Sequence, residues 1–492
     1  MTRFIRRKGT VAGMSSVAFR DAARPATLGQ LRQSGWEPAP IKEEVRRNVA
    51  ARIAAGQPVV DGVVGYDDTV LPQLENALLA GHDVIFLGER GQAKTRIIRS
   101  LVDLLDEWIP VVAGSEINDD PYHPVSRHAR DLVRDHGEGT PIEWAHRSTR
   151  FGEKLATPDT SIADLIGEVD PIKVAEGRYL SDELTLHYGL VPRSNRGIFA
   201  INELPDLAER IQVGLLNVLE ERDIQVRGYK IRLPLDLMLV ASANPEDYTN
   251  RGRIITPLKD RFGAQIRTHY PLDTDLELAV VRQEARPVDA AAVGVRGLRV
   301  EVPDHMADIV ATLSHEARRS PHVNQRSGVS VRLTIANYET MVANATRRAL
   351  RAGETVVVPR VSDLEAIPAS TAGKVEIETL DEGDDGAVLE RLVKSAVLGV
   401  FRQRCPIERF RDVLAEFDEG TIVHTGDDVP SAEYVRALAR LPALRAAVLP
   451  LAGTEHPAAL ASALELILEG LHLSRRLNKD AAGARATYRG RG

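Results

Sequence analysis

The residues whose types and spacing point most directly to chemistry are 88–95, which read Gly-Glu-Arg-Gly-Gln-Ala-Lys-Thr. They match the phosphate-loop pattern G-x-x-x-x-G-K-[ST] at every fixed position except Ala93, where the pattern has glycine. The segment follows an apolar run at Asp83–Leu87 and leads into a helix predicted over Thr95–Leu105. Backbone N–H groups of such a loop curl around phosphate oxygens, and the helix N-terminus adds partial positive charge. The spacing predicts a nucleotide-binding loop, rather than a strand–turn–helix that happens to end in Lys-Thr.

Three residues of this loop have distinct expected effects. Lys94 would reach the β- and γ-phosphates, and Thr95 would offer its hydroxyl to Mg²⁺. Ala93 adds a methyl group, and a positive φ at this residue would cost about 1–2 kcal/mol. We expect the loop to tolerate that strain.

A second apolar run, Ile198–Ile201, ends on Asn202 and Glu203. Beside a phosphate loop, this pattern is typical of a strand that places a magnesium-binding acid and then a glutamate that polarises the attacking water. Asn202 stands where that acid is expected. Its amide oxygen can orient a metal-bound water but carries no negative charge, so the affinity for Mg²⁺ is expected to fall. The alternative for Glu203 is a helix-start glutamate favoured by the helix dipole.

A third strand, predicted over Leu235–Ala241, leads to Asn244. A polar amide at the C-terminal end of a strand beside the other two can contact the γ-phosphate and hold the attacking water. The alternative is a turn asparagine before Pro245.

Arginines that could offset phosphate charge follow the three strands. Arg261 could be supplied to a neighbouring subunit, where its guanidinium would face the transferred phosphoryl group. The alternative is a surface ion pair with Asp260, and Arg251 or Arg253 could take the same role. Arg332, near the start of a helix in a second domain, could reach the bound nucleotide from the side of that helical lid.

The elements that must position these residues alternate between strands and helices, which predicts an α/β fold with a parallel sheet covered by helices. After Pro271 the pattern becomes helical, beginning with a capping box formed by Thr274 and Glu277. The predicted divisions are an N-terminal tail and helical extension (1–64), an α/β nucleotide-binding core (65–272), a helical lid (273–366), an acidic linker (367–388) and a helical C-terminal domain with a basic, disordered tail (389–492).

Composition narrows the class of protein. The 492 residues predict about three domains. The net charge of −7 disfavours a general nucleic-acid-binding protein, and Cys405 is the only cysteine, which excludes an internal disulfide and fits the cytoplasm. No run of about 18 uncharged apolar residues predicts a membrane span. Residues 1–20 are basic and are expected to be a disordered tail or to precede a start at Met14, with organelle targeting as the alternative.

Together these motifs resemble the AAA+ ATPases, and within them the magnesium-chelatase ATPase subunit and its MoxR-type relatives, over roughly 60–365. Three further segments carry the resemblance: Ala156–Gly167, Gly189-Leu-Val-Pro, and Leu219–Arg222 followed by a hairpin at Ile224–Leu233. Ala93 and Asn202 depart from the family pattern.

The resemblance implies an AAA+ phosphate-loop core with a parallel sheet, followed by a helical lid. The additional helical C-terminal domain is expected from its own apolar spacing and has no counterpart in the family that we can place. It implies ATP and Mg²⁺ as cofactors, with Glu203, Asn244 and Arg261 as catalytic residues and Thr95 and Asn202 at the metal. The expected nucleotide-binding residues are Gly88, Glu89, Arg90, Gly91, Gln92, Ala93, Lys94, Thr95 and Arg332.

The resemblance also implies self-association into a ring, expected to be a hexamer, and a protein partner with a von Willebrand A domain. Four functions compete: a motor that remodels such a partner, the motor of a true magnesium chelatase acting on a porphyrin, a non-catalytic nucleotide-gated scaffold, and a DNA-acting AAA+ regulator. The acidic net charge and the lack of a Gly-Ala-Phe-Thr-Gly-Ala loop weigh against the last.

Overall fold

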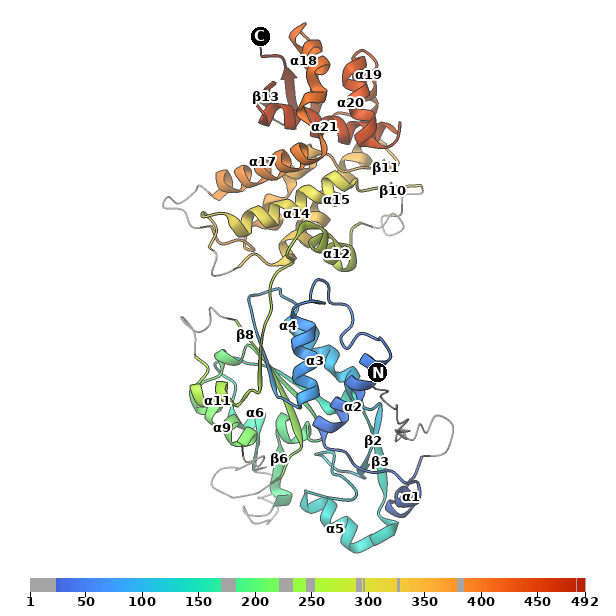
Figure 1. The fold of residues 1–492 in the computed structure, drawn as a ribbon, viewed down its shortest axis with the longest axis vertical. Coiled ribbons are helices and arrows are strands. Elements are labelled where there is room, and N and C mark those ends of the chain that lie inside the picture. The colour runs from blue at the N-terminus through green and yellow to red at the C-terminus, as the bar shows by residue number, and fades with distance from the viewer. Residues whose placement is uncertain are drawn as a thin grey trace, which may run out of the picture.

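The computed structural model arranges the chain in three tiers along its long axis, with the sheet at one end and the C-terminal segment at the other (Figure 1). It describes residues 24–169, 183–220, 233–244, 253–288, 294, 297–324, 328–377, 385–483 and 485–491. The hairpin predicted at Ile224–Leu233 lies outside these ranges except for Leu233, and Arg251 lies outside them.

A five-stranded parallel sheet organises the first tier, in the order β4-β7-β8-β1-β9. The strands are β1 (Val84–Leu87), β4 (Phe151–Leu155), β7 (Gly197–Asn202), β8 (Leu237–Ala243) and β9 (Ala264–Arg267). β7 and β8 are buried along their whole length, as parallel strands covered on both faces must be. The α/β fold class and the three predicted strands are confirmed.

Helices cover both faces of this sheet. One face packs against α2 (Ile41–Ala54), α3 (Val70–Ala80) and α4 (Lys94–Ser100), and the other against α9 (Glu209–Glu220) and α11 (Thr256–Arg261). Other described elements of this tier include α1 (Leu28–Gln33), the short 3-10 helix η1 (Leu101–Leu104), β2 (Trp108–Val112), α5 (Arg127–His136), β3 (Ile142–His146), α6 (Ile162–Leu165), β5 (Gly167–Val169), β6 (Leu186–Tyr188) and α8 (Leu190–Arg193).

The predicted division at residue 64 does not separate two packed units. α2, assigned to an N-terminal extension, contributes Val45 and Val49 to the same hydrophobic core as the sheet. Arg150 ends the 3-10 helix η3 (Arg147–Arg150) before β4. Its guanidinium donates to both carboxylate oxygens of Glu44 in α2, at 2.9 and 2.7 Å, and both side chains are buried. The four-residue apolar spacing identified the helix but not the surface that it covers.

The second tier is helical, as predicted, and consists of α12 (Thr274–Glu284), α14 (Asp304–Arg319) and α15 (Val331–Ala352), with a small parallel pair β10 (Arg299–Val300) and β11 (Val356–Val357). The predicted capping box is wrong by one residue. Asp273 is the N-cap of α12, and its carboxylate accepts from the Leu276 N–H at 2.8 Å. Glu277 is withdrawn from the cap because it is fully buried in an ion pair with Arg318.

The predicted linker does not separate the lid from the C-terminal segment. Its described residues include α16 (Pro368–Thr371), and α17 (Asp385–Arg404) begins within its predicted range. One hydrophobic core runs from Met306 and Leu333 of the lid to Val397 of α17 and Leu464 of α21 (Pro457–Leu473). The second and third tiers therefore share a core.

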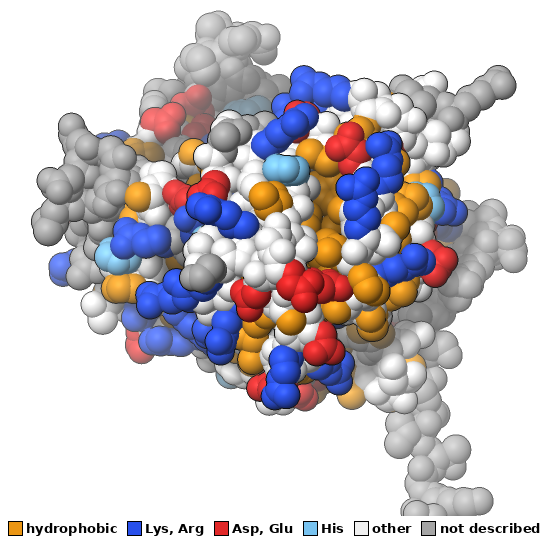
Figure 2. All heavy atoms as spheres, turned by 90° about the horizontal axis from the view of Figure 1, so that it is seen from above, with side chains coloured by type: hydrophobic (Ala, Val, Ile, Leu, Met, Phe, Trp, Pro, Cys, Tyr) orange, Lys and Arg blue, Asp and Glu red, His pale blue; other side chains and the backbone are white. Residues whose placement is uncertain are grey.

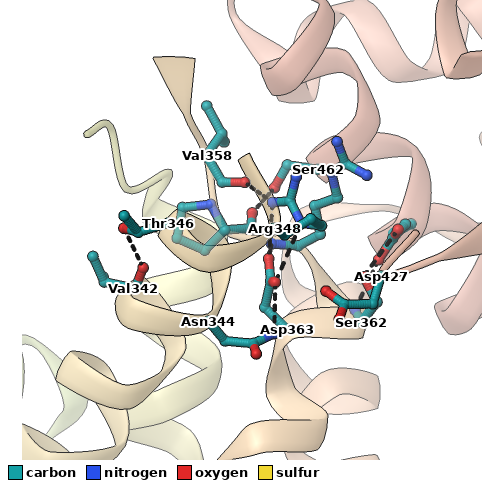
Figure 3. Close-up of polar contacts among 12 residues, drawn as sticks. Val342, Asn344, Thr346, Arg348, Val358, Ser362, Asp363, Asp427 and Ser462 are labelled. Atoms are coloured by element: carbon teal, nitrogen blue, oxygen red, sulfur yellow. Dashed lines mark hydrogen bonds and ion pairs between the residues drawn. The ribbon is translucent and has the colours of Figure 1, made fainter. Parts of the chain in front are cut away.

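Buried polar contacts reinforce that junction (Figure 3). The Arg348 guanidinium of α15 donates to Asp363 at 3.0 Å and to the Val358 carbonyl at 2.8 Å, and Asn344 donates to the same carboxylate at 2.9 Å. Asp363 lies in the 3-10 helix η6 (Val361–Ala366). From α21, Ser462 donates to the Pro359 carbonyl at 2.6 Å. Each buried polar group in this set thus has a partner, which a shared interior requires.

The third tier also contains strands, which corrects the prediction of a helical domain with a disordered tail. β13 (Asn478–Ala482) and β14 (Arg485–Arg489) form a hairpin, and β14 pairs with β12 (Ile422–Gly426). Tyr488 anchors the tail because its ring is buried and its hydroxyl donates to Glu469. Besides α21, the α-helices of this tier are α18 (Arg411–Asp418), α19 (Ser431–Leu438) and α20 (Pro442–Ala452), whereas α17 lies beside α14 in the second tier (Figure 1).

The buried ion pair of Glu44 in α2 with Arg150 in η3 gives a stability prediction. Glu44→Ala leaves the Arg150 cation buried without its carboxylate, so the free energy of unfolding should fall by about 3–5 kcal/mol in chemical denaturation. Glu43→Ala is the matched control, because Glu43 is the neighbouring, exposed acid of α2 and its loss should cost less than about 1 kcal/mol. Equal losses in the two variants would contradict a structural role for the buried pair.

Candidate active site

The phosphate loop lies at the carboxyl end of β1, which stands between β8 and β9 in the sheet. The carboxyl ends of parallel strands meet at one edge, and Leu87 of β1 pairs with Ala243 of β8. Asn202 is the last residue of β7, and Asn244 follows β8 directly. The structure therefore brings Lys94, Asn202, Glu203 and Asn244 to one edge, although 150 residues separate the first from the last.

Two left-handed residues give the loop its curvature. Gly91 has φ 75°, and Ala93, the N-cap of α4, has φ 55° and ψ 10°. The left-handed conformation is free for glycine but costs alanine about 1–2 kcal/mol. Ala93 therefore has the positive φ that the sequence analysis considered, and this strained residue is the N-cap of the phosphate-loop helix α4.

Lys94 is buried and its ammonium group is held by oxygen atoms. Its Nζ donates to Asn244 Oδ1 at 2.6 Å, to the Glu89 carbonyl at 2.8 Å and to the Gly88 carbonyl. Asn244 in turn donates through Nδ2 to Glu203 Oε2 at 2.8 Å. A continuous chain of contacts thus joins the amine, the amide and the carboxylate that the sequence singled out.

The backbone at Glu203 turns sharply so that its side chain reaches this chain of contacts. Glu203 has φ 55° directly after β7, and its N–H donates to the Ser242 hydroxyl at 3.2 Å. Non-glycine residues in this conformation are held by their surroundings and cluster at functional sites. No local sequence pattern marks this strained conformation.

Tyr66 contacts the phosphate loop through its hydroxyl, a role that the sequence analysis did not identify. Its hydroxyl lies 2.9 Å from the carbonyl oxygen of Gln92 and 2.8 Å from that of His269. Burial raises the pKa of Tyr66 to about 12, so the hydroxyl keeps its proton and remains a donor to the loop. The partner His269 is 203 residues away, and no local pattern marks that contact.

Tyr270, Arg318 and Glu277 connect the lid to the loop. Sequence analysis left Tyr270 and Arg318 unassigned and placed Glu277 in a helix cap instead. The Tyr270 hydroxyl donates to the Arg90 carbonyl at 2.9 Å, and the Arg318 guanidinium lies 4.5 Å from the centre of the Tyr270 ring. Arg318 donates to both carboxylate oxygens of Glu277, at 2.7 and 3.0 Å. These contacts connect α12 and α14 to the phosphate loop.

The two remaining predicted arginines lie in different places. Arg332 is the second residue of α15, whose N-cap Ser330 is so close to the loop that a Cβ at Gly91 would lie 1.9 Å from its hydroxyl. Arg261 ends α11 near the opposite edge of the sheet, since a Cβ at Gly263 would lie 2.6 Å from the His82 ring, before β1. The chain thus brings Arg332 toward its own loop and leaves Arg261 away from it.

The parallel sheet, the phosphate loop and the polar residues at its edge resemble the nucleotide-binding core of the AAA+ ATPases. Comparison with known proteins agrees with this class. The model of the Sigma-54 interaction domain matches residues 176–261. Magnesium-chelatase subunit ChlI-1 of Arabidopsis thaliana is 31% identical over 231 residues, which cover 46% of this chain and 51% of that protein.

The ChlI subunit of Nostoc sp. is 30% identical over 236 residues, which cover 45% of this chain and 57% of that protein. The chain spans about half the length of the curated relatives it matches. Among solved structures, the complex of the magnesium-chelatase subunits BchI and BchD aligns at 22% identity with a TM-score of 0.34, covering 65% of this chain and 98% of that one. The chain thus resembles the AAA+ ATPases and, among them, the magnesium-chelatase subunit ChlI.

The conformation of Ala93 gives a second stability prediction. Ala93→Gly removes about 1–2 kcal/mol of left-handed strain, and the freer unfolded chain returns about 0.5–1 kcal/mol of it. The free energy of unfolding should therefore rise by up to about 1 kcal/mol, measured by chemical denaturation. Ala51→Gly, in the exposed interior of α2, is the control and should lower it by about 1 kcal/mol. A destabilised Ala93→Gly variant would be inconsistent with the left-handed conformation.

Proposed function

We propose that this protein is an ATP-hydrolysing motor of the magnesium-chelatase and MoxR type, which uses nucleotide turnover to remodel or activate a protein partner. The observation that carries the proposal is the chain of contacts from Lys94 through Asn244 to Glu203 at the edge where the phosphate loop lies. A phosphate-binding amine, a polar amide and a water-polarising acid are the groups that nucleotide hydrolysis needs within reach of one another.

The residues at the loop fit ATP with Mg²⁺. Gly91 and Ala93 curve the backbone as an anion-binding loop requires, and a buried amine held by loop carbonyls fits an anion. The Thr95 hydroxyl and the Asn202 amide are the oxygen donors proposed for the metal. When bound, Mg²⁺ would neutralise charge on the phosphate oxygens.

We assign a separate role to each polar group in the Lys94–Asn244–Glu203 contacts. Lys94 is proposed to exchange its hydrogen bond to Asn244 for one to a phosphate oxygen, which frees the Asn244 amide oxygen. Glu203 is proposed to accept a hydrogen bond from the attacking water and to raise its nucleophilicity, with Asn244 fixing the direction of the carboxylate. Arg332 is proposed to contact the nucleotide from the lid, because α15 begins against the loop.

The position of Arg261 supports assembly into a ring, proposed to be a hexamer. Because Arg261 lies toward the edge opposite the loop of its own chain, it can serve only a site presented by another subunit unless the fold rearranges. A guanidinium supplied in trans makes hydrolysis depend on the contact between subunits.

The partner is proposed to be a protein with a von Willebrand A domain, or, as the alternative, the other components of a chelatase that inserts Mg²⁺ into a porphyrin. The relatives named as magnesium-chelatase subunits support the second candidate. Two observations distinguish these candidate partners. One is the identity of the genes beside this one, and the other is the set of proteins that co-purify with this chain in the presence of a slowly hydrolysed ATP analogue.

The match to the Sigma-54 interaction domain favours one further candidate, a DNA-acting regulator. Figure 2, which looks onto the C-terminal end, shows acidic and basic side chains interleaved there with hydrophobic ones gathered to one side. A face with mixed charge lacks the continuous basic stripe typical of DNA-binding surfaces. Stimulation of hydrolysis by DNA would nevertheless favour this candidate.

The role of Glu203 is tested by Glu203→Gln. Because the amide cannot polarise water as a carboxylate does, the rate of ATP hydrolysis should fall by about 100-fold or more while ATP binding is retained. Turnover is measured by phosphate release, and binding by calorimetry. Glu209→Gln, an exposed glutamate at the start of α9, is the matched control and should leave both unchanged. Equal rates in wild type and Glu203→Gln would instead support the nucleotide-gated scaffold.

The role of Arg261 is tested by mixing subunits. Arg261→Ala should lower hydrolysis by about 1,000-fold and spare nucleotide binding, since the arginine offsets charge only during phosphoryl transfer. Mixing it with Glu203→Gln subunits should restore part of the activity, because the second variant lends its intact Arg261 to the intact site of the first. If the mixture recovers no ATP hydrolysis, a role of Arg261 in trans is contradicted. Repeating the mixture with Arg253→Ala in place of Arg261→Ala tests whether Arg253 has this role instead.

A further inference from the structure

Asn202, which occupies the position of an expected acid, lies against a carboxylate from another strand. Its Nδ2 donates to Glu153 Oε1 at 2.6 Å, and its Oδ1 accepts from the Ser242 hydroxyl at 3.2 Å. The amide oxygen is thus engaged inside the sheet. The acidic oxygens at this point of the candidate site belong to Glu153.

The register of β4 and β7 explains how Glu153 reaches this point. Leu155 pairs with Asn202 and Glu153 pairs with Ala200, and the two strands are parallel. Paired residues share a face of a sheet, and so do residues two apart on one strand. Ala200 packs in the core formed with Ile97 of α4, so Glu153 and Asn202 both stand on the face that the phosphate-loop helix covers.

A contact from α4 places the carboxylate more closely. Arg99 Nε donates to both oxygens of Glu153, at 2.8 and 3.1 Å. Arg99 is one turn after Thr95, and residues four apart lie on the same face of a helix. The Glu153 carboxylate therefore lies between the stripe of α4 that carries Thr95 and the end of β7, which are the two places proposed for metal donors.

We propose that Glu153 supplies the negative charge for the Mg²⁺ that accompanies the nucleotide, in place of the acid absent at Asn202. This inference rests on the proposed function. Mg²⁺ is held in proteins by one or two carboxylates together with waters and substrate phosphates, and an amide alone provides no such charge. Arg99 competes with the metal for this carboxylate, and because its side chain is 64% exposed it can swing into solvent.

The experiment measures how much Mg²⁺ strengthens nucleotide binding to the full-length protein. A fluorescent ATP analogue is titrated in excess Mg²⁺ and in excess EDTA, and the ratio of the two affinities is the Mg²⁺ enhancement. Glu153→Gln should lower this enhancement by about 10-fold or more and leave the affinity in EDTA within about twofold. Glu143→Gln on β3 is the matched control and should change neither affinity.

The exchange variant Glu153→Gln with Asn202→Asp is the decisive arm. It moves the carboxylate to β7 and the amide to β4, keeps one hydrogen-bonded amide–carboxylate pair, and should restore the enhancement. Arg99→Gln alters only an exposed partner of Glu153, so it tests the proposal even if Glu153→Gln is too unstable to measure. This variant should raise the Mg²⁺ enhancement, because the Glu153 carboxylate is then no longer neutralised.

Two results would overturn the proposal. An unchanged enhancement in Glu153→Gln or in Arg99→Gln would show that Glu153 is only the ion-pair partner of Arg99. Loss in the exchange variant equal to that in Glu153→Gln would show that the charge is not transferable between the strands. Failure of the proposed function gives a different result, since wild-type protein would then bind no nucleotide with or without Mg²⁺.

Discussion

The burial of one ammonium group constrains the rest of the site. A lysine amine withdrawn from water must be surrounded by oxygen atoms, because an uncompensated buried cation is costly. Lys94 finds these oxygens in its own loop and in Asn244, which requires that the loop curve back on itself and that β1 and β8 stay in register. The same amine is therefore where an incoming phosphate competes with Asn244, and Asn244 in turn holds Glu203. Binding at the loop and the direction of the acid are linked by two hydrogen bonds.

The contact between loop and lid extends this linkage through the molecule. Tyr270 holds the loop at Arg90, and the buried pair of Arg318 and Glu277 ties Tyr270 to α12 and α14. Because α14 shares one hydrophobic core with the C-terminal tier, a shift at the loop moves a packed body rather than a single helix. The absence of a linker between lid and C-terminal segment thus has a mechanical consequence, since no joint in the described residues absorbs the motion.

Sequence reasoning succeeded where the determinant is local and failed where it is a distant contact. The loop and the strands ending on Asn202 and Asn244 follow from apolar runs and the residues that end them, which is why they were predictable. The pairing of Glu44 with Arg150 joins residues 106 apart, and Tyr66 meets His269 across 203 residues. The β13–β14 hairpin was missed because its strands are short and carry few large apolar residues, and its burial depends on Tyr488 reaching Glu469 in α21.

The departure at Asn202 shows the difference between a motif and a site. A sequence pattern assigns charge to a position along the chain, whereas a metal responds to charge at a position in space. Adjacent strands lie about 4.8 Å apart, so a longer acidic side chain on β4 can place its oxygens beside the end of β7. Glu153 does so at 2.6 Å from the Asn202 amide. An acid on a neighbouring strand can therefore supply charge at the same place once its partner Arg99 has moved away, although the local sequence pattern at Asn202 lacks that acid.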